Sequence, residues 1–150
     1  MEMISNEEKI TQAVLVSVDT GDYDAEASLA ELKELVKSAG AEPVFTVTQN
    51  LKRPETGTYV GTGKLQEIAD ICKQQEIDLL VFDCELSPTQ IRNIEAETDT
   101  RTIDRTMLIL DIFALRARSK EGKLQVELAQ LKYLMPRLTG KGVAMSRLGG

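Results

Sequence analysis

The stretch Ala13-Val14-Leu15-Val16-Ser17-Val18, closed by Asp19-Thr20-Gly21, decides the fold class. Five of its six residues are aliphatic and turn-forming residues end it, so it predicts a buried β-strand. Working outward, residues 25–39 place aliphatic side chains at i, i+3 and i+7, and Gly40 follows. This pattern predicts an amphipathic helix that ends at the glycine. A buried strand followed by such a helix is the first half of a β-α-β unit.

The same alternation continues over the first 104 residues. Further strands are predicted at residues 44–47, 77–82 and 100–103, with helices at 64–75 and from Pro88, which Ser87 caps. The order β-α-β-α-β-α-β requires crossover connections, which produce parallel strands covered by helices. Residues 1–104 are therefore predicted to form an α/β subdomain, a small four-stranded parallel sheet flanked by helices.

The pattern changes after Asp104. Residues 105–118 and 123–135 each carry an aliphatic stripe at helical spacing, and residues 119–122 form a break between them. Two helices joined by a short loop form an antiparallel hairpin, so residues 105–138 are predicted to be a helical hairpin subdomain. Residues 139–150 contain four glycines without periodicity, and are interpreted as a linker toward a domain that the chain lacks.

Acidic and basic residues are distributed unevenly. Residues 1–100 contain 20 acidic and 8 basic residues, whereas residues 101–150 contain 4 acidic and 10 basic residues. A basic C-terminal third on an acidic body favours contact with a polyanion. The plainer interpretation is a solvated helical surface, and charge alone does not decide between the two.

Composition excludes several function classes. The chain has no histidine, which removes Ser-His-Asp, Cys-His and imidazole-base catalysis. Its two cysteines, Cys72 and Cys84, are too few for a zinc site or a disulfide framework. No secretory signal and no apolar run long enough to cross a bilayer is visible. We therefore expect a cytoplasmic protein with no membrane span, no catalytic residues and no metal of its own.

The segment GTYVGTGKL, residues 57–65, has the look of a phosphate-binding loop. A P-loop needs a glycine five residues before its Gly-Lys pair and Ser or Thr after the lysine, but threonine and leucine stand there. What remains is a glycine turn that opens a helix, and helix N-termini attract anions. Its candidate phosphate contacts are Gly61, Gly63 and Lys64, with ordinary turn packing as the alternative.

Carboxylates follow the predicted strands at Asp19, Asp83 and Asp104, with Glu85 nearby. The carboxyl ends of parallel strands form the ligand crevice of a doubly wound sheet, and clustered carboxylates bind magnesium. The alternative is that these residues form turns and helix caps, as aspartate commonly does. We expect turns and caps, and predict no metal site.

Four cations and one acid surround the break in the predicted hairpin. The cations are Arg116, Arg118, Lys120 and Lys123. Arginine binds phosphate bidentately, lysine supplies a point charge, and a narrow basic finger can enter a crevice that a globule cannot. The alternative is a solvated loop, with cations favoured at the preceding helix's C-terminus.

The hairpin also resembles the N-terminal region of the HflX family of translational GTPases. The hairpin segments that carry the resemblance are IDRT (103–106), LDIFA (110–114), RAR (116–118), EGKLQVELAQL (121–131) and PRL (136–138). Two earlier segments are also similar, VGTGKL (60–65) and ELSPTQ (85–90), the latter continuing to Arg92-Asn93. The resemblance runs from about the first strand to the linker.

This resemblance implies a function. HflX proteins are ribosome-associated GTPases that bind the large subunit and can split stalled ribosomes. A loop of their helical subdomain reaches toward the peptidyl transferase centre, and corresponds to residues 118–123 here. The implied contacts with the large subunit and its RNA are Arg116, Arg118, Lys120 and Lys123 at the tip, together with Arg137 in the matching PRL segment.

The resemblance does not carry GTPase activity to this chain, which contains none of the G-domain motifs. GTP and Mg²⁺ are expected in the G domain of a longer parent, and no cofactor is expected here. Two other hypotheses stay open. One is a nucleotide-sensing α/β domain that binds ATP or a related ligand through the turn from Gly61 to Lys64 and the crevice at the carboxyl ends of the strands. The other is an interaction module whose hairpin stripe docks on its own G domain, which predicts exposed apolar surface and self-association.

Overall fold

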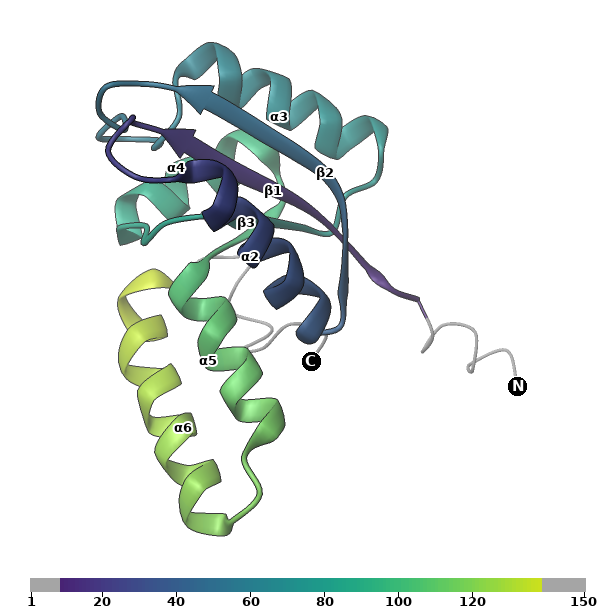
Figure 1. Ribbon diagram of the computed structural model, residues 1–150, viewed down its shortest axis with the longest axis vertical. Helices are drawn as coiled ribbons and strands as arrows, with labels where there is room; N and C mark the ends of the chain where they lie inside the picture. The colour runs from purple at the N-terminus through teal and green to yellow at the C-terminus, as the bar shows by residue number, and fades with distance from the viewer. Residues whose placement is uncertain (1–8, 139–150) are drawn as a thin grey trace.

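The computed structural model describes residues 9–138 and confirms the predicted α/β class (Figure 1). The strands are β1 (Thr11–Asp19), β2 (Ala41–Asn50), β3 (Leu79–Phe82) and β4 (Arg101–Asp104). The helices are α2 (Ala25–Ser38), α3 (Thr62–Gln74), α4 (Pro88–Thr98), α5 (Arg105–Arg116) and α6 (Lys120–Leu134), followed by the short 3₁₀ helix η1 (Met135–Arg137). The helices α5 and α6 form a hairpin that projects away from the sheet.

The four strands are parallel and lie in the order β2-β1-β3-β4. Side chains of α2 and α5 pack on one face of the sheet, and those of α3 and α4 pack on the other. The chain passes from β1 outward to β2 and then returns past β1 to β3, so the connections reverse direction between β1 and β3. In open α/β sheets, such a reversal is where ligand crevices form, at the carboxyl ends of the strands.

The strand β1 lies inside the sheet, and residues 13–18 are each at most 1% exposed. This burial on both faces explains why the strand is a continuous apolar run rather than an alternating one. Val14, Val16 and Val18 join the core beneath α3 and α4, whereas Ala13 and Leu15 join the core beneath α2 and α5.

Two helix starts show how local sequence sets the boundaries. The prediction for α4 is confirmed: Ser87 and Gln90 form a reciprocal capping box, and Pro88 occupies the first turn. The helix α3 begins at Thr62, so the prediction that it starts just after Gly63 is wrong and places the start too late. Gly61 is the N-cap residue, since its carbonyl accepts the hydrogen bond from the amide of Leu65.

The hairpin connection is shorter than predicted and lies at residues 117–119. The side chain of Ser119 accepts a hydrogen bond of 2.9 Å from the amide of Gly122, which caps α6 and draws Lys120 into its first turn. A β-carbon on Gly122 would lie 3.0 Å from the Ser119 hydroxyl, so glycine suits this close approach. The predicted break at residues 119–122 is therefore the start of a helix.

The aliphatic stripe predicted on α6 is largely exposed, although Leu131 lines a hollow with Ala114 and Leu115 of α5. The buried part of the contact with α5 is made by Leu134 and by Gln130, whose side-chain amide donates to Asp111 at 3.0 Å. The stripe residues are Leu124, Leu128, Leu131 and Met135, which are between 52% and 65% exposed. We call these four residues the exposed stripe. Across residues 9–138, no helix combines the length and the apolar composition that a bilayer span requires.

Candidate nucleic-acid interface at the hairpin tip

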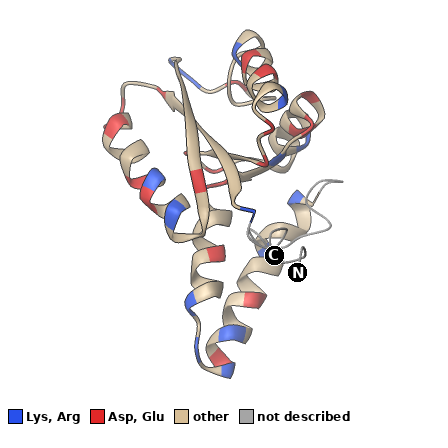
Figure 2. Ribbon diagram, turned by 90° about the vertical axis from the view of Figure 1, so that its right-hand side faces the viewer, with Lys and Arg blue, Asp and Glu red and all other residues tan. Residues whose placement is uncertain are grey.

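The tip of the hairpin gathers the four cations that the sequence singled out (Figure 2). Arg116 is the last residue of α5, Arg118 lies in the connection, and Lys120 and Lys123 lie in the first turn of α6. All four side chains are exposed. The structure therefore brings these predicted site residues together at one end of an elongated, narrow projection.

The electrostatics of the tip favour an anion. Within residues 9–138, none of the four cations forms an ion pair with another described residue. Glu121 is the one acid in the capped first turn of α6. The N-terminus of α6 also points its free amides and positive dipole end toward the tip. Four unpaired cations beside a helix N-terminus suit phosphate groups better than acidic or apolar partners.

Arg137 lies apart from the tip, in η1 at the root of the hairpin. Its Nε atom donates to the carbonyl of Leu86 at 3.1 Å, and its guanidinium lies 3.8 Å from the ring centre of Tyr133. A second guanidinium nitrogen donates to the carbonyl of Tyr133. These internal contacts support a structural role, and the assignment of Arg137 as an RNA contact stays a prediction.

The glycine turn is tied into the α/β body. The amide of Gly61 donates to Gln49 at the end of β2, and Asn93 of α4 donates to the carbonyl of Gly57, both at 2.9 Å. Tyr59 packs edge-on against Phe82 with ring centres 6.1 Å apart. Lys64 forms an ion pair with Glu67, one turn along α3. These contacts favour the packing interpretation of the turn.

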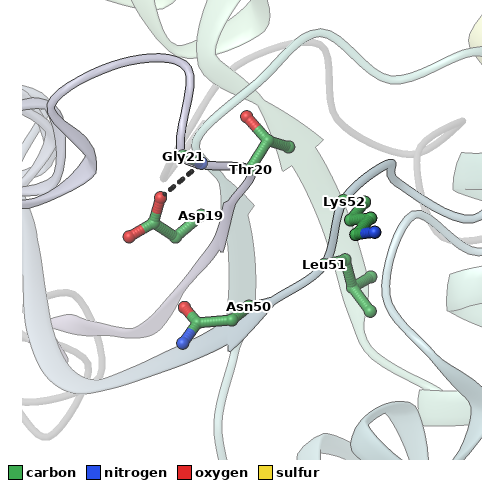
Figure 3. A pocket seen from close by; sticks show the side chains of 6 residues that line it. All are labelled: Asp19, Thr20, Gly21, Asn50, Leu51 and Lys52. Carbon is green, nitrogen blue, oxygen red and sulfur yellow. Dashed lines mark hydrogen bonds between the residues drawn. The ribbon is translucent and has the colours of Figure 1, made fainter.

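A pocket of about 410 Å³ lies at the carboxyl ends of β1 and β2 (Figure 3). Its lining residues are Asp19, Thr20, Gly21, Asn50, Leu51 and Lys52. Asp19 accepts a hydrogen bond of 2.9 Å from the amide of Gly21, which makes a turn. The candidate phosphate contacts Gly61, Gly63 and Lys64 do not line this pocket. The structure thus keeps the two parts of a nucleotide-site hypothesis separate.

The carboxylates at the strand ends serve as turn formers, caps and ion-pair partners. Asp104 caps α5 by accepting a hydrogen bond of 2.9 Å from the amide of Met107. Asp83 pairs with Arg105 at 2.5 Å, and Glu85 accepts from the Thr106 hydroxyl at 3.5 Å. In the described part of the chain, no group of three or more potential ligand side chains is arranged to hold a metal ion.

Sequence reasoning missed a polar network at the root of the hairpin. Asp104 is fully buried, and its Oδ2 atom accepts a hydrogen bond of 2.6 Å from the hydroxyl of Tyr133. Burial raises the pKa of this carboxyl above its ordinary value, against the opposing effect of its hydrogen bonds. The only sequence signal was an aspartate and an arginine placed side by side at 104 and 105, between a strand and a helix.

Comparison with known proteins finds matching families and similar sequences. Residues 26–114 match the family described as GTP-binding GTPase N-terminal, and residues 116–150 match the GTP-binding GTPase Middle Region. The chain is similar to GTPase HflX of Lacrimispora saccharolytica, with 53% identity over 99% of this chain and 36% of that protein. GTPase HflX of Escherichia coli K12 is 49% identical over 93% of this chain and 33% of that protein. The chain thus spans about a third of the length of these curated relatives.

Two solved structures of GTP-binding proteins have a similar fold over most of this chain. A GTP-binding protein from the archaeon Sulfolobus solfataricus, in complex with GDP, has 32% identity and a TM-score of 0.64 over 85% of this chain and 38% of that one. A complex of SsGBP and GDP gives 32% identity and a TM-score of 0.67 over 86% of this chain and 36% of that one.

Proposed function

Because the chain belongs to the HflX family of GTPases and matches its N-terminal region, we propose that it binds ribosomal RNA of the large subunit through its hairpin tip. The observation that carries the proposal is the group of four exposed, unpaired cations at the end of the projecting hairpin. A narrow finger of this kind reaches phosphates inside a folded RNA. The function of the longer protein would be ribosome splitting and rescue in the cytoplasm.

The proposal is tested by binding of the 150-residue chain to purified large subunits, measured by co-sedimentation at several salt concentrations. The test variant reverses the four tip cations to glutamate: Arg116→Glu, Arg118→Glu, Lys120→Glu and Lys123→Glu. We expect affinity to fall by about 100-fold or more, because each lost phosphate contact removes about one unit of log–log salt slope.

A matched control reverses four exposed cations on the α/β body, which changes the net charge equally. These are Lys33→Glu, Lys37→Glu, Lys73→Glu and Arg92→Glu. If the tip is the contact, the control retains most of the affinity at moderate salt. Equal losses in both variants would point to non-specific attraction by net charge, and unchanged binding by the tip variant would remove the proposal.

GTP hydrolysis belongs, in this proposal, to the longer protein. The curated relatives are named GTPases and are about three times as long as this chain. The P-loop pattern fails in the glycine turn, where threonine and leucine replace the required glycine and hydroxyl residue. We therefore place GTP and Mg²⁺ in a separate G domain, and expect no GTP turnover by the 150-residue chain in a phosphate-release assay.

The exposed stripe supports a second role, docking of the hairpin on the protein's own G domain. Four large apolar side chains that share one helix face are unusual for a surface that remains in water. In the absence of that domain, the stripe would drive self-association. Light scattering of the 150-residue chain should show a mass that rises with concentration, and Leu128→Glu should restore the monomer. A strictly monomeric chain at high concentration would count against this role.

A nucleotide-sensing function receives less support from the geometry. Asp19 at the end of β1, and Asp22 and Asp24 in the loop that follows, repel phosphates. The glycine turn lies outside the pocket at the ends of β1 and β2. Calorimetry with a panel of nucleotides decides the matter. Measurable heat together with protection of Lys64 from chemical modification would restore this hypothesis.

A further inference from the structure

The loop at residues 83–87, which joins β3 to α4, is attached to the start of α5. The side chain of Asp83 pairs with Arg105 at 2.5 Å, and the carbonyl of Cys84 accepts from the amide of Arg105 at 3.0 Å. The carbonyl of Val16 accepts from the amide of Asp83 at 2.8 Å, so the same loop is anchored to the central strand β1. The first helix of the hairpin is therefore fixed to the sheet at its first residue.

The same loop also holds the other root of the hairpin. The amide of Leu86 donates to Oδ2 of Asp104 at 2.9 Å, and this oxygen also accepts the hydroxyl of Tyr133 from α6. The carbonyl of Leu86 accepts from Arg137 of η1. One short loop thus contacts both the start of α5 and the end of the hairpin at η1, through side-chain and backbone hydrogen bonds.

Arg105 extends these attachments to α2, which packs on the same face of the sheet as α5. Besides Asp83, its guanidinium contacts Glu31 and Ser28 of α2. These contacts join the elements that follow β1 and β3, at the point where the connections reverse direction. In this class of fold that position commonly receives a ligand. In this protein the side chain of its own hairpin root lies there.

We infer that the loop at residues 83–87 is a mount for the hairpin and that Arg105 is the positioning residue that fixes the hairpin's angle to the sheet. This inference rests on the proposed function, because a fixed angle matters when the tip must reach one place on a large partner. Arg105 suits the task because its planar fork holds Asp83 and the α2 side chains at once, whereas a lysine makes point contacts.

Because Asp83 is buried, the stability of the fold depends on its ion pair with Arg105. Its side chain is only 1% exposed, and its second oxygen, Oδ2, has no partner in the described part of the chain. Removal of Arg105 would therefore leave a buried carboxylate without its cation, which is strongly destabilising. Arg105→Lys keeps the charge and shortens the reach to α2, so it is the informative substitution.

The orientation of the hairpin is measured by residual dipolar couplings of backbone amides in the ¹⁵N-labelled 150-residue chain. In the unmodified chain, one alignment tensor should fit the amides of β1 and those of α5 and α6. In Arg105→Lys, the hairpin amides should require a tensor of smaller magnitude than the sheet amides. Tyr133→Phe, which removes one hydroxyl from the other root, should produce the same loss to a smaller degree and serves if Arg105→Lys does not fold.

Val36→Ala is the control, because Val36 of α2 is fully buried in the core beneath α2 and α5, to which the loop at residues 83–87 contributes no side chain. It should lower stability while leaving one shared tensor. A shared tensor in both mount variants would overturn the inference, since it would show that these contacts stabilise without positioning. The couplings require no ribosome, so this result stands apart from the binding test of the tip.

Discussion

The hydroxyl of Tyr133 and the carboxylate of Asp104 meet at 2.6 Å, and this hydrogen bond joins the last turn of α6 to the N-cap of α5. The residues are 29 positions apart in the chain. Asp104 is fully buried, so its charged form is stabilised by hydrogen-bond donors rather than by water. These donors also include the amides of Leu86 and Met107. The hairpin is consequently closed at its root by a carboxylate that water does not reach.

Loss of this hydroxyl should weaken the fold measurably. Tyr133→Phe keeps the ring beneath Arg137 and removes one donor from the buried carboxylate, so we expect a loss of about 1.5–3 kcal/mol in the free energy of unfolding. Tyr23→Phe is the matched control, because the hydroxyl of Tyr23 donates to a neutral carbonyl, that of Val18. Urea denaturation of both variants should rank Tyr133→Phe as the more destabilising. Equal effects would mean that the Asp104 contact has no special weight.

The raised pKa of Asp104 gives stability a defined pH dependence. The folded chain holds this proton at a higher pH than the unfolded chain, whose value is near 3.8. Protonation therefore stabilises the folded state, and the contribution of Asp104 grows as the pH falls through the folded pKa toward about 4. Asp104→Asn lacks this titration. The difference in free energy of unfolding between the original chain and the variant should increase from pH 7 to pH 4, and a constant difference would contradict the prediction.

The sequence predicted the elements of the sheet because each signal was local. The buried run at residues 13–18, and the Ser87 cap with Pro88, depend on neighbours within a few positions. The start of α6 was misjudged because Gly122 looked like a break. It lies instead in the first turn of α6, where its amide donates to the capping hydroxyl of Ser119. A glycine can mark a turn or a close approach, and periodicity does not separate these cases.

The candidate site was predicted only in part, for a related physical reason. The tip cations are close in sequence, so their clustering followed from the hairpin pattern. Arg105 contacts Glu31 and Asp83, from which it is separated by 74 and 22 positions in the chain. Contacts of that range arise from the strand order, which single-sequence patterns do not provide. The position of Arg137 at the root has the same origin, since its partner Leu86 is 51 positions away.

Replacement by alanine should have opposite effects on stability at two glycines. Gly40 has φ of +92°, a conformation that costs an L-residue about 1–2 kcal/mol, so Gly40→Ala should be destabilising by that amount. Gly63 lies in the first turn of α3, where a β-carbon would meet no described atom within 4 Å, so Gly63→Ala should be neutral or stabilising by up to about 1 kcal/mol. Thermal unfolding distinguishes the two. A destabilising Gly63→Ala would show that the glycine turn needs its flexibility.

Both cysteines should be unreactive in the folded chain. Burial raises the pKa of the Cys84 thiol and that of the Cys72 thiol above their ordinary values, so little thiolate forms near pH 8. Alkylation by iodoacetamide at pH 8 should be at least about 10-fold slower than that of a free cysteine peptide. Mass spectrometry should find two modifications once urea unfolds the chain. Rapid modification of the native chain would show that this part of the α/β body opens frequently.

Neighbouring leucines on α6 separate the root packing from the exposed stripe. Leu134 is 8% exposed and packs against α5, so Leu134→Ala should lower the free energy of unfolding by about 2–5 kcal/mol. Leu131 is 52% exposed, so Leu131→Ala should change it by less than about 0.5 kcal/mol in a dilute, monomeric chain. The same Leu131→Ala change should reduce self-association in light scattering, because the side chain belongs to the exposed stripe. A large stability loss for Leu131→Ala at low concentration would instead place Leu131 within the packed hairpin, and the docking role of the stripe would lose its basis.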